Sequence, residues 1–301
     1  MICINLKLIG LFFDLKFKMK WFFKMFFFIS PFLGLCQSIS DLEESLIQQL
    51  ELVQVEKNYS KSIIQNETFK ALLKKTIQRD DAFEYPFDSL SKFMSTITSR
   101  DGYFRLFNWN IELNNQKQHY ECWILLKDKK IIKLNDYKNT IPNIEFTTLG
   151  ANNWFGALYF DIIQVNKNNK TVYTLLGWDG NDMFSNKKVI ECLTFNKKDK
   201  IQLGNSIFNY PNNKSKKRVI FQYNKDSYMS LKHHHIKKTE YIVFDHLSPT
   251  SPNLKDFPDW YVTDLSFDAF KWEDNQWNFQ TDFNAKAIKS IRKPFNDPNN
   301  K

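Results

Sequence analysis

The sequence has little cysteine, no long uninterrupted apolar run and no block of charge of one sign. Its most apolar stretch runs from Met25 to Leu35, and Lys24 ends it on the N-terminal side. A membrane-spanning helix needs about 20 mainly apolar residues. The stretch is therefore too short for a membrane anchor, and it has the length of the apolar region of an export signal.

The residues on both sides of this stretch complete the pattern of a bacterial export signal. Met19 to Lys24 supplies the positive region, and Gly34 and Cys36 place small residues at positions −3 and −1 of a cleavage site. We expect cleavage between Cys36 and Gln37, so that the mature chain is periplasmic or secreted and meets the membrane only through the uncleaved signal. In the alternative, a lipoprotein, Cys36 would carry the lipid, but such signals have a small residue where Leu35 stands. Residues 1–18 have no role in the signal, which favours Met19 as the true start.

The charge balance excludes a nucleic-acid partner. Cleavage removes five lysines and one aspartate, so that the net charge falls from +9 to +5. Nucleic acid would require basic residues clustered on one face. The strongest basic run, Lys214 to Arg218, stands between turn residues and a strand-like segment, which is typical of a solvated hairpin.

Two cysteines remain after the cleavage site, Cys122 and Cys192. Each lies in a strand-like run. An oxidising compartment would allow a disulfide between them, and two buried thiols fit the same pattern. We favour the buried thiols and keep the disulfide as the alternative.

The hydrophobic pattern predicts an α+β fold, with a short N-terminal helical segment followed by a large antiparallel, meander-type β domain. Residues 37–100 have helical spacing, with helices expected from Ser40, over Thr68 to Gln78, and from Pro86 through Ile97. From Asp101 to residue 285 the period is two and the links are short and rich in Asn and Asp, which predicts antiparallel hairpins. The pattern leaves a barrel, a sandwich and a propeller-like set of sheets open, with a tail at 286–301. The expected strands are 103–113, 119–127, 130–134, 153–165, 171–178, 187–195, 217–223, 227–233, 239–246, 265–272 and 276–280.

Several segments between about residues 85 and 285 resemble a family of uncharacterised exported proteins from Bacteroidetes. The most distinctive is Leu175 to Asn181, and Gln37 after the cleavage site is also common in exported proteins of that group. The resemblance implies export and brings no activity with it. The other segments are Phe104 to Trp109, Val189 to Phe195, Lys217 to Tyr223 and Val243 to Pro249.

The strongest candidate for a ligand site is Trp178-Asp179-Gly180-Asn181-Asp182. Three side-chain oxygens beside an aromatic ring are typical of a Ca²⁺ or carbohydrate site. A hairpin loop in which Asp and Asn bind backbone amides explains the same residues, and we favour that interpretation.

Two other motifs contain the residue types of a metal site and of a hydrolase triad, but both are weak evidence for such a site. In the run His233 to His235, only two side chains share a face of a strand, and the neighbouring lysines oppose a cation, so we expect no metal. Asp245-His246-Leu247-Ser248 contains the residue types of a hydrolase triad. Adjacent strand residues point to opposite faces, so Asp245 is not placed to orient His246.

Acidic residues lie among aromatic residues near the end of the β domain. Carboxylate pairs flanked by aromatic rings are used by glycoside hydrolases, and an aromatic core face with acidic solvent positions gives the same spacing. Glu121 and Glu191 are placed on apolar strands, where we expect partners such as Arg105 or Arg218 and raised pKa values. The acidic residues of the first group are Asp259, Asp264, Asp268, Glu273 and Asp274.

These observations favour a non-enzymatic binding or envelope-associated module. Its partner would be a glycan or an envelope protein, and no cofactor or metal is expected. One alternative is a glycan-acting hydrolase with a carboxylate pair drawn from Asp179, Asp182, Asp264 and Asp268. The other is a structural protein without a ligand. The predicted ligand surface consists of Trp178, Asp179, Asn181, Asp182, Trp260 and Tyr261.

Overall fold

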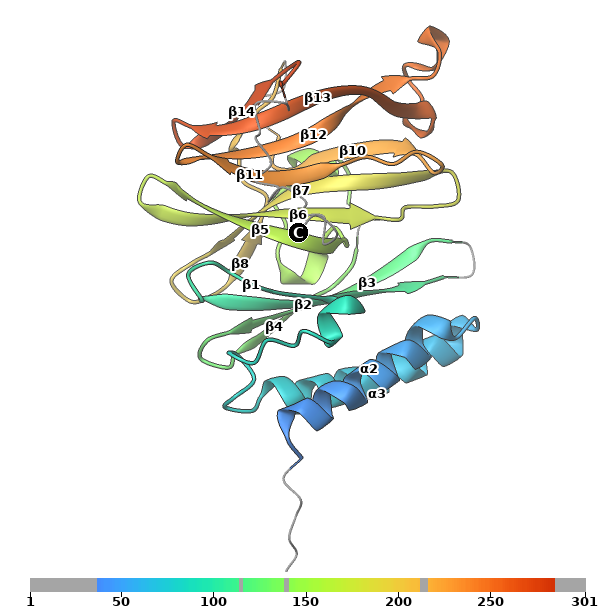
Figure 1. The fold of residues 1–301 in the computed structure, drawn as a ribbon, viewed down its shortest axis with the longest axis vertical. Coiled ribbons are helices and arrows are strands. Elements are labelled where there is room, and N and C mark those ends of the chain that lie inside the picture. The colour runs from blue at the N-terminus through green and yellow to red at the C-terminus, as the bar shows by residue number, and fades with distance from the viewer. Residues whose placement is uncertain (1–36, 114–115, 138–140, 212–215, 285–301) are drawn as a thin grey trace, which may run out of the picture. The chain divides into compact units, whose positions relative to one another are not determined.

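The computed structural model describes residues 37–113, 116–137, 141–211 and 216–284 (Figure 1). The predicted export signal with Cys36 and the tail at 286–301 lie outside these residues. The chain divides into a unit of residues 1–41 and a compact unit from Leu42 to Lys301. In the first unit, Ser38 and Asp41 exchange hydrogen bonds of 3.1 Å through their side chains and backbone amides. Within the described residues, no helix has the length and apolarity to cross a membrane.

In the part of the chain from residue 37 that the structure describes, two helices precede the sheets, α2 (Ile39–Val55) and α3 (Tyr59–Ile77). The residues expected on the apolar face of the first helix, from Leu42 to Val53, are buried. The second helix begins well before the predicted Thr68, because Asn58 caps it: the Asn58 side chain accepts a hydrogen bond of 3.2 Å from the Lys61 amide.

The predicted third helix, from Pro86, is wrong. Phe87 has a φ of 55°, which a right-handed helix excludes, and only the short 3₁₀ turn η1 (Leu90–Lys92) follows. The next residues form the strand β1 (Ser95–Thr98), which pairs with the strand beyond the Asp101 turn. Three of these four residues are Thr or Ile, whose branched side chains favour a strand.

The strands form three open sheets, and in the described chain none of them closes. The first sheet has the order β1-β2-β3-β4, the middle sheet has the order β10-β7-β6-β5 with β8 on β7, and the third has the order β11-β12-β13-β14-β9. All pairings are antiparallel, as predicted, except the short parallel pairing of β14 with β9. The remaining bounds are β2 Phe104–Glu112, β3 Gln118–Leu126, β4 Ile131–Leu134, β5 Leu158–Lys167, β6 Lys170–Asp179, β7 Ser185–Phe195, β8 Ile201–Leu203, β9 Phe208–Asn209, β10 Val219–Asn224, β11 Leu231–Ile236, β12 Thr239–Pro249, β13 Tyr261–Glu273 and β14 Gln276–Gln280.

The middle sheet is buried on both faces. On β7, Val189 and Leu193 belong to a core cluster shared with the first sheet, while Ile190 and Cys192 belong to a second cluster shared with the third sheet. Because successive side chains of a strand point to opposite faces, β7 contributes residues to two separate cores. On the other face of the first sheet, Phe69 of α3 packs edge-on against Trp109.

The alternative of a disulfide between Cys122 and Cys192 is wrong. Both thiols are free and buried, and they lie in different core clusters on opposite faces of the middle sheet. Burial raises the pKa of both thiols well above the usual range of cysteine. They contribute as small apolar side chains.

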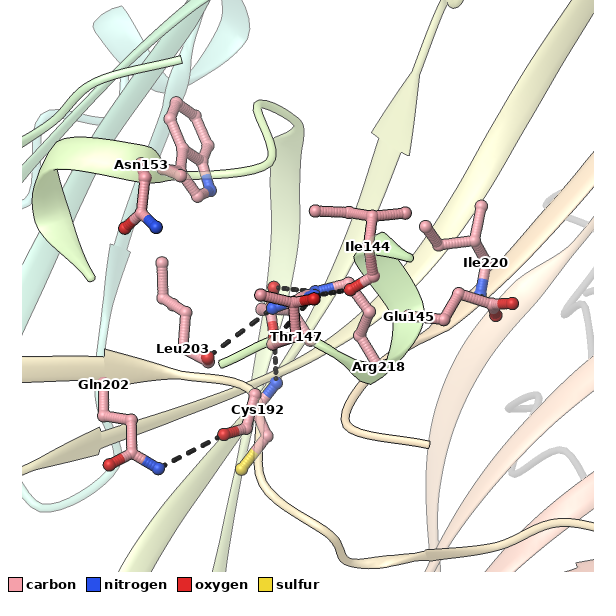
Figure 2. A network of polar contacts seen from close by, with 12 residues as sticks. Ile144, Glu145, Thr147, Asn153, Cys192, Gln202, Leu203, Arg218 and Ile220 are labelled. Carbon is pink, nitrogen blue, oxygen red and sulfur yellow. Dashed lines mark hydrogen bonds and ion pairs between the residues drawn. The ribbon is translucent and has the colours of Figure 1, made fainter. Parts of the chain in front are cut away.

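A fully buried ion pair joins the middle sheet to the loop that precedes it. The Arg218 Nε donates to Glu191 Oε2 over 2.6 Å, and neither side chain is exposed. Arg218 Nη1 also donates to the carbonyls of Ile144 and, over 3.0 Å, Thr147 (Figure 2). Burial raises the pKa of Glu191, although Arg218 opposes this shift. The expected partner and the expected pKa direction are confirmed for Glu191.

Removing this carboxylate should destabilise the fold severely. Glu191→Ala leaves the Arg218 charge buried without its counter-ion, which we expect to cost about 3–5 kcal/mol of unfolding free energy, measured by urea denaturation. Glu273→Ala is the matched control, because Glu273 pairs with Lys271 at the surface and should cost no more than about 1 kcal/mol. Similar losses for the two variants would contradict the role assigned to the buried pair.

Candidate functional site

The pairing of β12 with β13 is interrupted at one position. Asp245 is paired with Phe267 and Leu247 with Thr263, so His246 on β12 stands opposite Asp264, Leu265 and Ser266 on β13. Leu265 has a φ of 70° and is 90 % exposed. A leucine rarely adopts this backbone conformation, and such strained bulges often redirect side chains at functional sites.

The bulge collects three polar side chains around one imidazole. His246 Nδ1 lies 2.8 Å from Asp268 Oδ2, and His246 Nε2 lies 3.9 Å from Asp264 Oδ2. Ser248 donates from its hydroxyl to Asp264 Oδ2 over 2.7 Å. The serine therefore hydrogen-bonds to a carboxylate, and the structure supplies no hydrogen bond between the serine hydroxyl and the imidazole.

Electrostatics fix the charge state of this cluster. The hydrogen bond with Asp268 raises the pKa of His246, and the carboxylate charges add to the shift against a smaller effect of burial. Partial burial opposes ionisation of Asp264, but hydrogen bonds from Ser248 and Ser266 outweigh it and lower the pKa of Asp264 to about 2. A cationic imidazole between two carboxylates is thus favoured at mildly acidic pH.

The imidazole opens onto a cavity of about 730 Å³ between the middle and third sheets. This volume is typical of small-molecule sites. We call it the sheet pocket. The aromatic residues that line it are Phe155, Tyr210, Phe221, Phe244, Tyr261 and Phe279, and the polar ones include Glu145, Asn181, Lys187, Gln222, Asp245, His246 and Asp268.

Beside the sheet pocket, hydrogen bonds tie the end of β10 and the turn after it to the β6–β7 and β12–β13 loops. Gln222 Nε2 donates to Asp259 Oδ1 over 2.5 Å, and Asn224 Nδ2 donates to the Asp259 carbonyl over 2.9 Å. The Lys225 amide donates to the Phe184 carbonyl over 2.9 Å. These loops carry large exposed apolar side chains, which we call the loop surface: Met183, Phe184, Tyr228, Phe257 and Trp260.

Residues 178–182, the candidate loop for a Ca²⁺ or carbohydrate ligand, form a turn whose acidic side chains bind backbone amides. Asp179 is fully buried and its Oδ1 accepts hydrogen bonds from the Tyr120 hydroxyl over 3.1 Å and the Asn181 amide over 2.9 Å. Asp182 Oδ1 accepts from the Phe184 and Ser185 amides. The favoured interpretation, a hairpin loop with Asp capping backbone amides, agrees with these bonds.

The other residues of the predicted ligand surface divide between the sheet pocket and its surroundings. Asn181 and Tyr261 both line the sheet pocket, whereas Trp260 is 52 % exposed on the loop surface. Trp178 is half-buried and lies against Gly180, where an added Cβ would come within 2.8 Å of the indole ring. The glycine is needed for this close packing rather than for a positive φ. Gln37, at the predicted cleavage site, is exposed.

The histidine run forms a carboxylate-centred cluster. Glu240 Oε2 lies 2.6 Å from His233 Nε2, and Glu240 Oε1 lies 2.9 Å from His235 Nδ1. Among the described residues, no group of three or more His, Cys, Asp or Glu side chains is arranged to hold a metal ion.

The expectations for Glu121 and for Arg105 need correction. Glu121 pairs with Lys70 over 2.9 Å rather than with an arginine, and although burial opposes ionisation, contacts with His119 and Lys70 lower its pKa instead of raising it. Arg105 donates to the backbone carbonyls of Tyr85 and Pro86 rather than to a carboxylate, and burial lowers its pKa to about 10.

The expected failure of Asp245 to orient His246 agrees with the structure. Asp245 Oδ2 accepts instead from the Ser230 amide over 2.7 Å. The residue that holds the imidazole, Asp268, comes from the next strand. The sequence indicated it as one of several acids and as a candidate for a carboxylate pair, without a link to His246. Asp268 therefore holds the imidazole of His246 in place. The imidazole can donate a hydrogen bond to a ligand, and no nucleophile is hydrogen-bonded to it.

The chain matches no family model, no curated protein and no solved structure. The resemblance to exported Bacteroidetes proteins therefore stays a prediction, and the site has to be interpreted from its own geometry.

Replacing Asp268 should lower the pKa of His246. Asp268→Asn removes the charge behind the 2.8 Å contact, so the imidazole should titrate closer to its ordinary value near 6.5. The pKa of His246 is raised on folding, so its stabilising effect is complete below the unfolded pKa and is lost as pH rises through the folded one. Imidazole proton NMR across pH 5–9 measures the shift, with His234 as the internal control. An unchanged His246 titration would contradict this assignment.

Proposed function

We propose that the protein is a non-enzymatic binding module that takes a glycan in the sheet pocket, with the loop surface as a stacking platform. The observation that carries the proposal is the junction of the two: Asn181 and Tyr261 line the sheet pocket, while the neighbouring Trp260 projects from the loop surface. Sugars present apolar faces to aromatic rings and hydroxyls to polar side chains, and this site offers both.

The polar groups of the sheet pocket support a ligand rich in hydroxyls. His246 can donate a hydrogen bond, and Gln222, whose amide nitrogen already donates to Ser185 and Asp259, can accept one through Oε1. Glu145 and Asp268 can accept further hydrogen bonds. Asp268 restrains the imidazole, so that less side-chain entropy is lost when a ligand binds.

The same contacts favour binding over glycan hydrolysis. A hydrolytic general acid needs a carboxyl group whose pKa is raised towards neutrality. The pKa of Asp264 is instead about 2, and Asp179 and Asp182 hold the amides of their own turn. We also propose that the sheets form a layered, sandwich-like stack. Each core cluster is shared between two sheets, which supports this arrangement.

The proposal is tested by affinity electrophoresis in gels that contain bacterial and plant polysaccharides. We expect at least one polysaccharide to retard the protein, and Trp260→Ala and Gln222→Ala to weaken the retardation about tenfold, in line with ~1–2 kcal/mol for a stacking or hydrogen-bonding contact. Tyr59→Ala is the matched control, because Tyr59 is an exposed aromatic residue at the start of α3. Release of reducing ends from the retarding polysaccharide would favour the hydrolase instead, and equal losses in the control would refute the site.

We also propose that the protein acts in the periplasm or outside the cell. The support is the pattern from Met19 to Gln37, since a positive region, an apolar stretch and small residues before the cleavage site are what export requires. N-terminal sequencing of protein recovered from the periplasm or medium should begin at Gln37. Intact protein that starts at Met1 or Met19 and stays in the cytosol would contradict export.

A further inference from the structure

A second cavity, of about 1110 Å³, lies at one end of the middle sheet. We call it the lysine pocket. The turn between β5 and β6 contributes Lys167 and Lys170, and the turn between β7 and β8 contributes Lys197 and Lys200. It shares no lining residue with the sheet pocket.

The acid in the described lining and the acid of the second turn both have other partners. Asp101, the one acid in the described lining, accepts a hydrogen bond of 2.7 Å from the Tyr173 hydroxyl. Asp199, in the second turn, accepts from the Tyr103 hydroxyl over 2.6 Å and faces Lys130 at 3.4 Å. The hydrogen bond with Asp199 raises the pKa of Tyr103 to about 12, so its hydroxyl stays neutral.

The lysines themselves are left without counter-ions. Lys167 Nζ reaches only neutral acceptors, Asn205 Oδ1 at 3.4 Å and the Ser206 carbonyl at 3.2 Å. Across the described part of the chain, the exposed ammonium groups of Lys170, Lys197 and Lys200 have no hydrogen bond or ion pair. Four positive charges therefore surround a cavity with little compensation.

The hairpin between β5 and β6 places two of the lysines directly opposite each other. Lys167 and Lys170 are direct register partners that close the two-residue turn Asn168-Asn169, whose φ angles are 48° and 61°. Like charges placed directly opposite each other destabilise a strand pair. Where a sequence breaks a local rule of this kind, the compensating gain is commonly functional.

We propose that the lysine pocket binds a compact polyanion that carries two or more phosphate or sulfate groups. Lysine ammonium groups bind such anions as point charges. The neutral lining groups Thr171, Asn196 and Gln202 add hydrogen-bonding capacity for the rest of the ligand. This proposal is independent of the glycan proposal, because the two pockets share no lining residue and the net charges of their lining residues have opposite signs.

The test is isothermal titration of the purified protein at low salt with two probes, sodium tripolyphosphate and a sulfated heparin disaccharide. We expect one or both to bind, with affinity that falls as salt rises. Binding of tripolyphosphate alone identifies a phosphorylated ligand, and binding of the disaccharide alone identifies a sulfated one. Lys170→Gln/Lys200→Gln should weaken binding at least tenfold.

The matched control is Lys237→Gln/Lys238→Gln. These lysines are exposed in the turn between β11 and β12, so the control removes the same charge away from the cavity and should leave the affinity within twofold of the original. Equal weakening by the control, or no binding of either probe, would overturn the proposal.

Thermal unfolding supplies a second readout. Without a probe, Lys170→Gln should melt no lower than the original protein, because the substitution relieves the repulsion from Lys167. With tripolyphosphate, the melting temperature of the original protein should rise, and that of Lys170→Gln/Lys200→Gln should not. A lower melting temperature of Lys170→Gln without a probe would show that the lysine is structural, which also overturns the proposal.

Discussion

The ion pair between Glu191 and Arg218 is the constraint on which the layered arrangement depends. It lies in the middle sheet, which is buried on both faces, and it fastens the loop at Ile144 and Thr147 to that sheet. A buried charge is tolerated only when it is paired and hydrogen-bonded. The pair therefore specifies how the loop meets the sheet, and both cavities lie on the sheet that it anchors.

The sheet pocket depends on an irregularity in otherwise regular pairing. A continuous β12–β13 ladder would leave no room for three residues opposite His246. The bulge turns Asp264 and Ser266 towards each other and leaves Leu265 exposed. The β12–β13 pairing is interrupted here, and this allows an imidazole and two carboxylates to lie together beside a cavity.

The two cavities have opposite electrostatic character. The sheet pocket contains acidic groups around His246, with Lys187 already bonded to Asn181 at 2.7 Å. The lysine pocket has ammonium groups with little compensation. The two ligand proposals follow this difference: a neutral, hydroxyl-rich ligand for the sheet pocket and an anionic one for the lysine pocket.

The sequence by itself determined the α+β character, the apolar face of the first helix and most antiparallel hairpins, because these follow from local spacing and turn residues. It also indicated the partner of Glu191, since a buried acid requires a base. The strand β1 in place of a helix, the His246–Asp268 contact and the gathering of lysines from two hairpins were decided by tertiary structure. Each depends on register or packing between segments distant in the chain, and a local pattern carries no information about those distances.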